Sequence, residues 1–202
     1  MTHLALLLHG VGAQGADMGG LAEALALPGL AFAAPDAPFP FNAAPGSPGR
    51  QWFSVSGVTA ANRAARVADA RAPFDRVIAD TLAAHGLTGR PDRVVLIGFS
   101  QGAIMALDAI ATGRIPAGGL IAFSGRLATP APLAPARTPI LIAHGRQDGV
   151  IPVTEATAAA TALTAAGNTP DLILEDGLGH APGPAGLARA RALLTRWMAA
   201  SA

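Results

Sequence analysis

The sequence contains no cysteine and no lysine, and it has few charged residues of either sign. Without cysteine there can be no disulfide framework, no thiolate metal site and no cysteine-based redox chemistry. Charged residues make up 13% of the chain, against an average of about 25% in soluble proteins. All 14 basic residues are arginines, and 13 acidic residues nearly balance them, so the net charge is +1. Because the arginines form no cluster and no aromatic residues are interleaved with them, nucleic-acid binding is not expected.

Long hydrophobic runs are also missing. The mean hydropathy of +0.41 owes much to 48 alanines, which helices accept at almost any position. The most apolar stretch, residues 94–107, is interrupted by two glycines, a serine and a glutamine, whereas a membrane span needs about 20 consecutive apolar residues. The apolar run at residues 4–8 is too short for a secretory signal and has no cationic residue before it. We therefore expect a cytoplasmic protein with no transmembrane segment.

The chain length predicts a single domain. A domain of 202 residues can bury about 70% of its unfolded surface without a disulfide or a metal. Residues 34–49 and 129–139 are rich in proline, glycine and alanine, but a boundary at either would leave pieces with too few strands to close a core. We interpret both as surface loops of one domain spanning residues 1–202. Exposed apolar surface on such an alanine-rich chain is compatible with a monomer or a homodimer.

Short apolar runs alternate with segments of helical length along the whole chain. The apolar runs, each expected to be a buried strand, are Leu4–Leu8, Leu30–Ala33, Arg93–Gly98, Gly119–Phe123, Pro139–Ala143 and Asp171–Leu174. The segments expected to be helices are Met18–Leu27, Ala61–His85, Gln101–Thr112, Thr154–Ala166 and Gly186–Ala200. This alternation predicts an α/β fold in which a mostly parallel sheet of about six strands carries helices on both faces.

The motif with the clearest chemical meaning is Gly98-Phe99-Ser100-Gln101-Gly102, which lies between a predicted strand and a predicted helix. In a strand–turn–helix elbow a serine is held in a strained conformation and serves as a nucleophile. Glycine is needed on both sides because a Cβ atom there would collide with the neighbouring strand and helix. An ordinary glycine-rich turn is the alternative, but the flanking elements favour Ser100 as a nucleophile.

A serine nucleophile needs a histidine to take its proton and an acid to orient that histidine. In this architecture the chain order is Ser, then Asp or Glu, then His, each on a loop after a later strand. His180 is the only one of the five histidines that lies in a loop between the last predicted strand and the last predicted helix. Asp148 follows the penultimate predicted strand. We therefore predict a catalytic triad of Ser100, His180 and Asp148.

Other acidic residues are less suited to this role. Asp36 precedes the nucleophile in the chain, so we expect it to cap or orient the proline-rich loop. Asp108 falls within the helix after the elbow, where we expect a charge on the helix surface. Glu175 lies too near His180 in sequence to approach it from a neighbouring loop, and we expect it to be solvated.

Acyl transfer also needs two N–H donors for the developing oxyanion. The backbone N–H of Gln101, at the N-terminus of its helix, is one candidate, and that of Val11, in the glycine-rich loop after the first strand, is the other. A competing interpretation exists for that loop, because the spacing Gly10-x-Gly12-x-x-Gly15, with Asp36 21 residues later, fits a dinucleotide fingerprint. It leaves the predicted triad unexplained, so we regard it as the weaker hypothesis.

Several segments together resemble the phospholipase/carboxylesterase family of α/β-hydrolases, which includes the acyl-protein thioesterases. The resemblance runs in order over nearly the whole chain. Its motifs are Leu8-His9-Gly10-Val11-Gly12, Arg50-Gln51-Trp52-Phe53, Gly98-Phe99-Ser100-Gln101-Gly102, His144-Gly145-Arg146-Gln147-Asp148 and Gly179-His180. It implies an α/β-hydrolase that cleaves carboxylic esters or thioesters without a cofactor or metal, with the triad and oxyanion donors at the positions predicted above.

The substrate class follows less directly from the chain. Trp52 and Phe53 are candidates for the walls of the acyl pocket, with burial in the core as the alternative. Ser54 stands where the family often has aspartate, and the short segment after Phe123 leaves no room for a large helical lid. We therefore expect a serine carboxylesterase acting on small to medium acyl groups. An acyl thioesterase or lysophospholipase on the same triad is an alternative, and so is a non-catalytic binding protein on the same fold.

Overall fold

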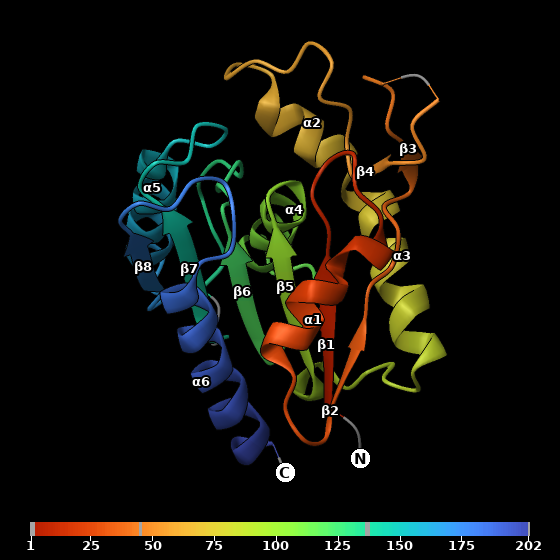
Figure 1. The fold of residues 1–202 in the computed structure, drawn as a ribbon, viewed down its shortest axis with the longest axis vertical. Coiled ribbons are helices and arrows are strands. Elements are labelled where there is room, and N and C mark those ends of the chain that lie inside the picture. The colour runs from red at the N-terminus through yellow and green to blue at the C-terminus, as the bar shows by residue number, and fades with distance from the viewer. Residues whose placement is uncertain (1–2, 45, 136–137, 202) are drawn as a thin grey trace.

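A six-stranded parallel sheet forms the centre of the molecule (Figure 1). The computed structural model describes residues 3–44, 46–135 and 138–201. Its strand order is β2-β1-β5-β6-β7-β8, and every neighbouring pair in it is parallel. The strands are β1 (His3–Leu8), β2 (Leu30–Ala33), β5 (Val94–Phe99), β6 (Gly119–Phe123), β7 (Ile140–Gly145) and β8 (Asp171–Glu175). All six expected strands are present, and the predicted α/β-hydrolase architecture is confirmed.

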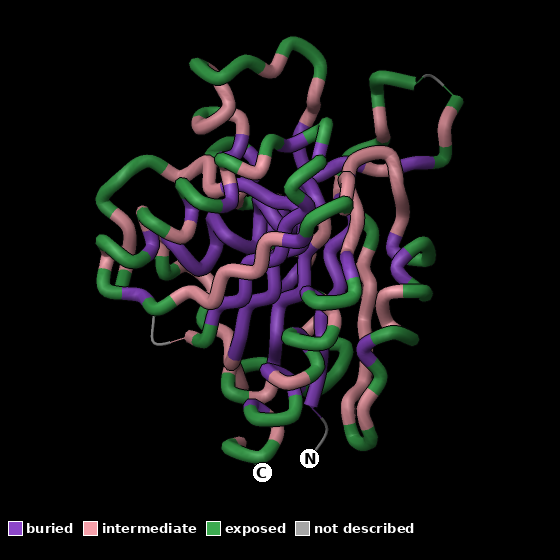
Figure 2. The backbone as a smooth tube through the Cα atoms, turned by 60° about the vertical axis from the view of Figure 1, so that its left-hand side comes forward, coloured by how far each residue is buried: buried purple, intermediate pink, exposed green. Residues whose placement is uncertain are grey.

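The central strands are buried on both faces, which explains why they read as continuous apolar runs. Figure 2 shows the buried segments gathered in the middle of the molecule, with exposed segments around them. Along β1, Leu4 and Leu6 belong to one hydrophobic cluster and Ala5 and Leu7 to the other. Successive side chains of a strand point to opposite faces, so each central strand contributes to two cores, as parallel sheets with helices on both sides require.

Helices cover both faces of the sheet. They are α1 (Gly19–Leu25), α2 (Arg63–Asp69), α3 (Arg71–Ala84), α4 (Gln101–Ala111), α5 (Val153–Ala165) and α6 (Pro184–Ala200), with 3₁₀ turns η1 (Gly15–Met18) and η2 (Pro91–Arg93). Helices α1 and α6 lie in front of the sheet in Figure 1, and α3, α4 and α5 lie behind it. Leu25 of α1 and Trp197 of α6 pack in one cluster, and Phe74 of α3 and Met105 of α4 pack in the other. None of these helices, in the described ranges, is long and apolar enough to cross a membrane.

The helix expected over residues 61–85 is two helices, α2 and α3, separated at Ala70. Pro73 is the third residue of α3. It has no N–H to donate to the carbonyl four residues earlier, at Asp69, so a continuous helix would lose that bond and strain its backbone there. A helix can instead begin here, because the N–H groups of a first turn have no intrahelical partner.

A short antiparallel pair was not expected from the sequence. Strands β3 (Phe39–Pro40) and β4 (Arg50–Gln51) pair within and beside the proline-rich loop. The guanidinium of Arg50 donates to the carbonyl oxygens of Ala37 and Pro38 at 2.8 and 2.7 Å. These bonds satisfy loop carbonyls that no regular strand or helix would satisfy, so the loop is held at the upper right of the molecule in Figure 1.

The expectation that Asp108 is a charge on the helix surface is wrong. Its side chain is fully buried and both of its oxygens accept hydrogen bonds. Oδ1 accepts from Arg71 and Thr129, and Oδ2 accepts from Arg71 and Arg114, at 2.6 to 3.0 Å. Burial alone would raise the pKa of Asp108, but the bonds from Arg71, Thr129 and Arg114 outweigh it, so the pKa lies below its usual value. Asp108 thus ties α4 to α3 and to the loop after β6.

The strand order determines where a ligand can bind. The chain turns to one side of β1 to form β2 and to its other side to form β5. Ligands of open α/β sheets bind at such a reversal, outside the carboxyl ends of the strands. The residues that follow β1, β5, β7 and β8 therefore converge at the carboxyl ends of the strands, and the predicted triad and oxyanion donors are among them.

Candidate active site

Ser100 forms a sharp turn between β5 and α4. Its backbone has φ 52° and ψ −116°, a conformation that residues with a side chain rarely adopt. A Cβ atom at Gly98 would lie 2.5 Å from the backbone of Ala103, and one at Gly102 would lie 2.1 Å from the carbonyl oxygen of Leu8. Glycine is thus required at both positions, by the helix at the first and by the strand β1 at the second, as the elbow motif predicts.

The three residues of the predicted triad meet in space. Ser100 Oγ lies 2.9 Å from His180 Nε2, and His180 Nδ1 lies 2.7 Å from Asp148 Oδ2. Because the carboxylate can only accept, Nδ1 carries the proton and Nε2 is free to receive the proton of the serine hydroxyl. The side chain of Asp148 is fully buried and that of His180 is 18% exposed. His180 Nε2 is thus oriented to accept the proton of the Ser100 hydroxyl.

Asp148 is held by several donors besides His180. Its Oδ1 accepts the backbone N–H groups of Val150 and Ile151, both at 2.9 Å. Burial alone would raise the pKa of Asp148, but the bond from His180 and these two amides outweigh it, so the pKa lies below its usual value. Asp148 therefore stays ionised and can stabilise a positively charged His180.

A second histidine reaches the same carboxylate, and sequence reasoning missed it. His144, at the end of β7, is buried, and its Nε2 lies 2.8 Å from the carbonyl oxygen of Ile151 and 3.1 Å from Asp148 Oδ2. Both neighbours are acceptors, so Nε2 carries the proton. The signal was present in the sequence, because residues 144 and 148 belong to one motif four positions apart.

The loops that carry Asp148 and His180 are bonded to each other. The N–H of Gln147 donates to the carbonyl of Leu178 at 3.0 Å, and the N–H of Arg146 donates to that of Glu175 at 2.9 Å. A Cβ atom at Gly145 would lie 2.2 Å from the carbonyl oxygen of Leu178. The absence of a side chain at Gly145 thus lets the two loops approach closely enough for their side chains to meet.

The expectation that Glu175 is solvated is wrong. It is 9% exposed, and its carboxylate accepts the N–H groups of Ala185 and Gly186 at 2.8 and 2.9 Å. These amides belong to the first turn of α6, where N–H groups lack intrahelical partners and the helix dipole favours a negative charge. Glu175 thereby fixes both ends of the loop that carries His180.

The two predicted oxyanion donors lie on either side of the elbow. A Cβ atom at Gly10 would lie 3.3 Å from Ser100 Cβ, so the loop after β1 runs directly beside the nucleophile. Within residues 3–44, 46–135 and 138–201, neither Val11 N–H nor Gln101 N–H donates a hydrogen bond. Both amides are therefore available to a substrate oxygen, although their aim at an oxyanion stays a prediction.

The side chain of Gln101 has a role that the sequence did not indicate. Its Oε1 accepts the N–H of Trp52 at 2.8 Å, and its Nε2 donates to the carbonyl of Phe53 at 2.7 Å. The indole N–H of Trp52 donates in turn to the carbonyl of His9 at 2.9 Å. Segment 52–53 is thus anchored to the elbow on one side and to the loop after β1 on the other.

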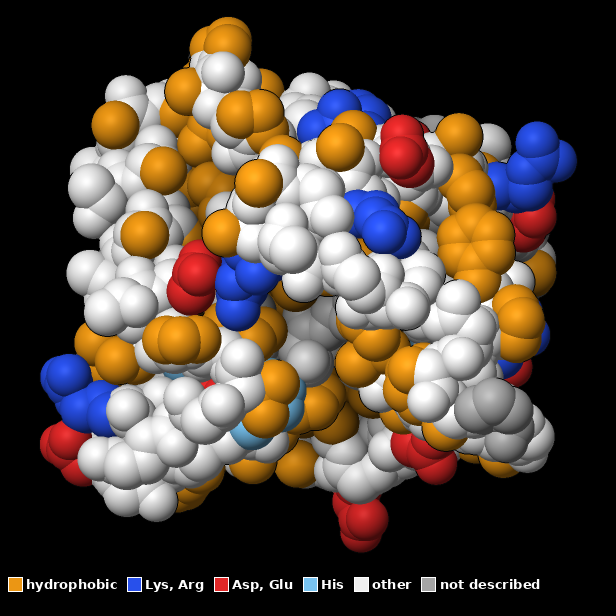
Figure 3. Space-filling view, turned by 90° about the horizontal axis from the view of Figure 1, so that it is seen from above, with side chains coloured by type: hydrophobic (Ala, Val, Ile, Leu, Met, Phe, Trp, Pro, Cys, Tyr) orange, Lys and Arg blue, Asp and Glu red, His pale blue; other side chains and the backbone are white. Residues whose placement is uncertain are grey.

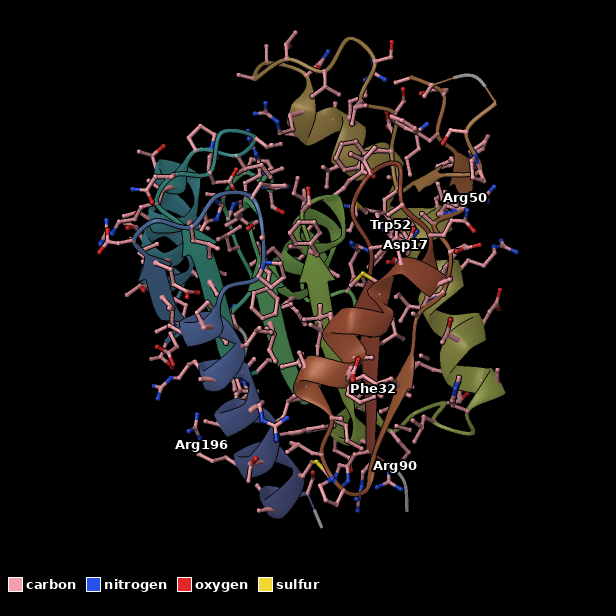
Figure 4. The ribbon with its side chains drawn as sticks, viewed as in Figure 1. Asp17, Phe32, Arg50, Trp52, Arg90 and Arg196 are labelled. Atoms are coloured by element: carbon pink, nitrogen blue, oxygen red, sulfur yellow. The ribbon has the colours of Figure 1, made fainter. Side chains whose placement is uncertain are left out.

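Trp52 and Phe53 were predicted to line the substrate pocket. Trp52 has no exposed surface, and it packs 5.1 Å, centroid to centroid, from the ring of Phe74. It lies at the upper end of the sheet in Figure 4, and because it has no exposed surface it packs in the core instead of lining the pocket. Phe53 is 6% exposed, and its contact with a substrate stays a prediction.

The glycine-rich loop after β1 has a packing explanation. Asp36 Oδ1 accepts the N–H of Gly15 at 2.7 Å, so its carboxylate orients this loop. A Cβ atom at Gly15 would lie 1.9 Å from the carbonyl oxygen of Ala34. These contacts account for Gly15 and Asp36, the two residues that completed the dinucleotide fingerprint, without a nucleotide.

The upper face of the molecule is hollowed at this site. Figure 3 shows a depression bordered by hydrophobic side chains and by part of a histidine side chain. Across the described ranges, no group of three or more His, Asp or Glu side chains is placed to hold a metal ion. The arrangement of an activated serine, an oriented histidine and two available amides is suited to acyl transfer.

Comparison with known proteins supports this interpretation of the chemistry. The model of the Phospholipase/Carboxylesterase family matches residues 1–198. Esterase YpfH of Escherichia coli (strain K12) is 38% identical over 181 residues, which cover 88% of this chain and 75% of that protein. The crystal structure of esterase PE8 superposes with a TM-score of 0.82 at 32% identity, covering 96% of this chain and 92% of the other. Acyl-protein thioesterase 1 of Saccharomyces cerevisiae is 36% identical over 70 residues, about a third of each chain.

Proposed function

This chain belongs to the phospholipase/carboxylesterase family and is a hydrolase of ester bonds, and we propose that Ser100, His180 and Asp148 are its catalytic triad. The observation that carries the proposal is the chain of contacts from Ser100 Oγ to His180 Nε2 and from His180 Nδ1 to Asp148. We propose further that residues 1–202 act as one catalytic domain, as a monomer or homodimer and without a cofactor. We also propose that the protein acts in the cytoplasm, and fractionation of cells expressing the full gene would test this location.

The proposed reaction has two steps. In the first, Ser100 Oγ attacks the acyl carbon while its proton passes to His180 Nε2, and the resulting oxyanion accepts hydrogen bonds from Val11 N–H and Gln101 N–H. The bond to the leaving oxygen then breaks, and His180 gives its proton to that oxygen. In the second, water gives a proton to His180 and attacks the acyl-serine, and the released Oγ regains the proton.

The substrates we propose are esters of small to medium acyl groups. The β3–β4 pair and the α2 region reach over the site (Figure 1) without forming a large lid. Thioesters are the second candidate substrate, and the 70-residue similarity to an acyl-protein thioesterase supports it. The triad itself does not distinguish a leaving oxygen from a leaving sulfur.

Hydrolysis of p-nitrophenyl acetate, butyrate and octanoate by wild type and by Ser100→Ala tests the triad. Ser124→Ala is a matched control, because Ser124 is also buried at a strand end with positive φ, and in the described structure its hydroxyl has no hydrogen-bond partner. We expect Ser100→Ala to abolish turnover and Ser124→Ala to retain it. Equal rates in wild type and Ser100→Ala would refute the assignment. The rate ratio of ethyl butyrate to S-ethyl thiobutyrate then separates esterase from thioesterase.

A further inference from the structure

An apolar hollow of about 330 Å³ adjoins the predicted triad on the face that carries α1 and α6. Its walls come from both helices, from the turn before α1 and from the loop before α6. The lining side chains that matter here are Met18, Leu21, Ala24, Phe99, Pro182 and Leu187. The volume is near the lower end of the range for ligand sites, about 300–1,000 Å³, so a small apolar group fits it.

The hollow lies beside the reacting groups, with the ring of Phe99 between them. The ring of Phe99 lines the hollow and lies 5.0 Å, centroid to centroid, from the ring of His180. A Cβ atom at Gly10 would lie 3.3 Å from both the ring of Phe99 and Ser100 Cβ. Pro182, in the wall, follows His180 by two residues. The wall of the hollow that Phe99 and Pro182 form therefore lies next to the histidine.

The position beside His180 decides which half of a substrate the hollow can take. His180 must hand its proton to the leaving atom, so the leaving group lies on the histidine side of the acyl carbon. The carbonyl oxygen lies toward the amides of Val11 and Gln101. We propose that the hollow binds the leaving group, and that the substrates are esters of uncharged apolar alcohols. This inference rests on the proposed function.

The charge of the residues that line the hollow limits which alcohols can bind there. Asp17 is the only charged residue among the described residues that line the hollow. Its Oδ2 accepts the N–H of Gln14 at 2.8 Å, which holds the carboxylate at the start of η1 (Figure 4). A fixed negative charge at the wall repels anionic leaving groups such as phosphorylated alcohols. An aliphatic chain or an aromatic ring meets no such penalty.

The test compares alcohols at a constant acyl group. Ethyl, butyl and hexyl acetate are hydrolysed by wild type and by Ala24→Trp, with proton release measured at constant pH. Ala24 is exposed on α1 and lines the hollow, so a tryptophan there fills it without entering the core. Glu23→Trp is the matched control, since Glu23 is the exposed neighbour that does not line the hollow.

We expect the wild-type kcat/KM to rise by up to about fourfold per added methylene, the full value of burying one. Ala24→Trp should lose this rise, and Glu23→Trp should keep both the rise and the wild-type rate on ethyl acetate. The proposal is overturned if Ala24→Trp leaves the alcohol series unchanged, or if it instead lowers the rates of ethyl butyrate and ethyl hexanoate, which would assign the hollow to the acyl group. Ethyl acetate turnover that is insensitive to Ser100→Ala would refute the proposed triad itself.

A second measurement uses alcohols as acceptors of the acyl group, which reverses the release of the alcohol from an ester. An alcohol can replace water in the second half-reaction, giving its proton to His180 and taking the acyl group on its oxygen. With p-nitrophenyl acetate as donor, we expect 1-hexanol to compete with water several times more effectively than ethanol in wild type and in Glu23→Trp, and no better than ethanol in Ala24→Trp. Equal partitioning to the two alcohols in wild type would contradict the proposal.

Discussion

His144 Nε2 lies 3.1 Å from Asp148 Oδ2, the same oxygen that accepts the hydrogen bond from His180. The carboxylate of Asp148 thus lies between two imidazoles. That of His180 contacts Ser100, and that of His144 is buried. The buried imidazole also binds the carbonyl of Ile151, whose own N–H donates to Asp148 Oδ1. Asp148 is therefore fixed on both oxygens before His180 is considered.

This arrangement predicts that His144 positions Asp148. His144→Phe keeps most of the volume and removes the N–H donor, and a hydrogen bond to a charged group is worth about 1.5–3 kcal/mol. We expect kcat on p-nitrophenyl butyrate to fall about tenfold or more, with KM nearly unchanged. His144→Gln places an amide N–H near the same point and should recover most of the loss. Equal impairment of both variants, with equal thermal stability, would argue against a positioning role.

The strained backbone of Ser100 predicts that the glycine variant at this position is more stable than the alanine variant. Ser100→Ala and Ser100→Gly both lose the hydroxyl and its contact with His180, so only the backbone preference separates them. Relief of a strained conformation is worth about 1–3 kcal/mol, and the extra freedom of glycine in the unfolded chain offsets about 0.5–1 kcal/mol of it. Ser100→Gly should therefore be more stable than Ser100→Ala by about 1 kcal/mol in urea unfolding, provided φ stays near 52°. A more stable alanine variant would show that this strain is absent in solution.

The buried ion pairs of Asp108 predict a large loss on truncation. Asp108→Ala leaves Arg71 and Arg114 without their shared carboxylate and detaches Thr129. Breaking a buried pair costs about 3–5 kcal/mol, and we expect the lower end because both arginines keep some access to water. Asp92→Ala, which breaks an exposed pair with Arg90, should change the free energy of unfolding little. Similar losses in the two variants would mean that burial of the Asp108 network contributes nothing.

His9 predicts a pH dependence of stability. Burial lowers its pKa from 6.5, against smaller opposing effects of its bond to Gly10 and of the nearby Asp36 carboxylate. Its Nε2 accepts the N–H of Ala37 and its Nδ1 donates to the carbonyl of Gly10, so the neutral ring is the form that fits. The unfolded chain therefore binds a proton more readily, and this contribution to stability is complete above about pH 6.5 and is lost as the pH falls through the folded pKa.

The measurement for His9 is the slope of the free energy of unfolding between about pH 7 and pH 5. We expect the slope to be smaller in His9→Asn, which does not titrate, than in wild type. The variant is less stable overall because it loses packing, so the slope and not the absolute value is the readout. His3, whose pKa burial also lowers, is present in both proteins and cancels in the comparison. Parallel slopes would show that His9 has no part in the acid lability.

Local patterns in the sequence were sufficient to predict the strands, the elbow and three side chains that the structure brings together. The runs that form β1, β5, β6 and β7 are apolar because both faces of these strands are covered, so the residues that point to either face are apolar. Ser100, Asp148 and His180 could be predicted as a triad because chain order and loop position restrict each of them strongly. The break between α2 and α3 could have been found as well, since Pro73 lies inside the expected helix.

The surroundings of those side chains were decided only in three dimensions. Asp108 and Glu175 look like surface charges along the chain, yet each is buried because partners 6 to 37 residues away supply the hydrogen bonds that make burial favourable. The same holds for Trp52, which reads as a pocket wall and is instead a buried support bonded to residues 43 and 49 positions away. The sequence by itself determined which residues are the candidates for nucleophile, base and acid, because these roles depend on single residues in their local elements. The tertiary structure alone decided which polar groups are compensated and where the apolar hollow lies, because compensation and cavities depend on contacts between segments distant in the chain.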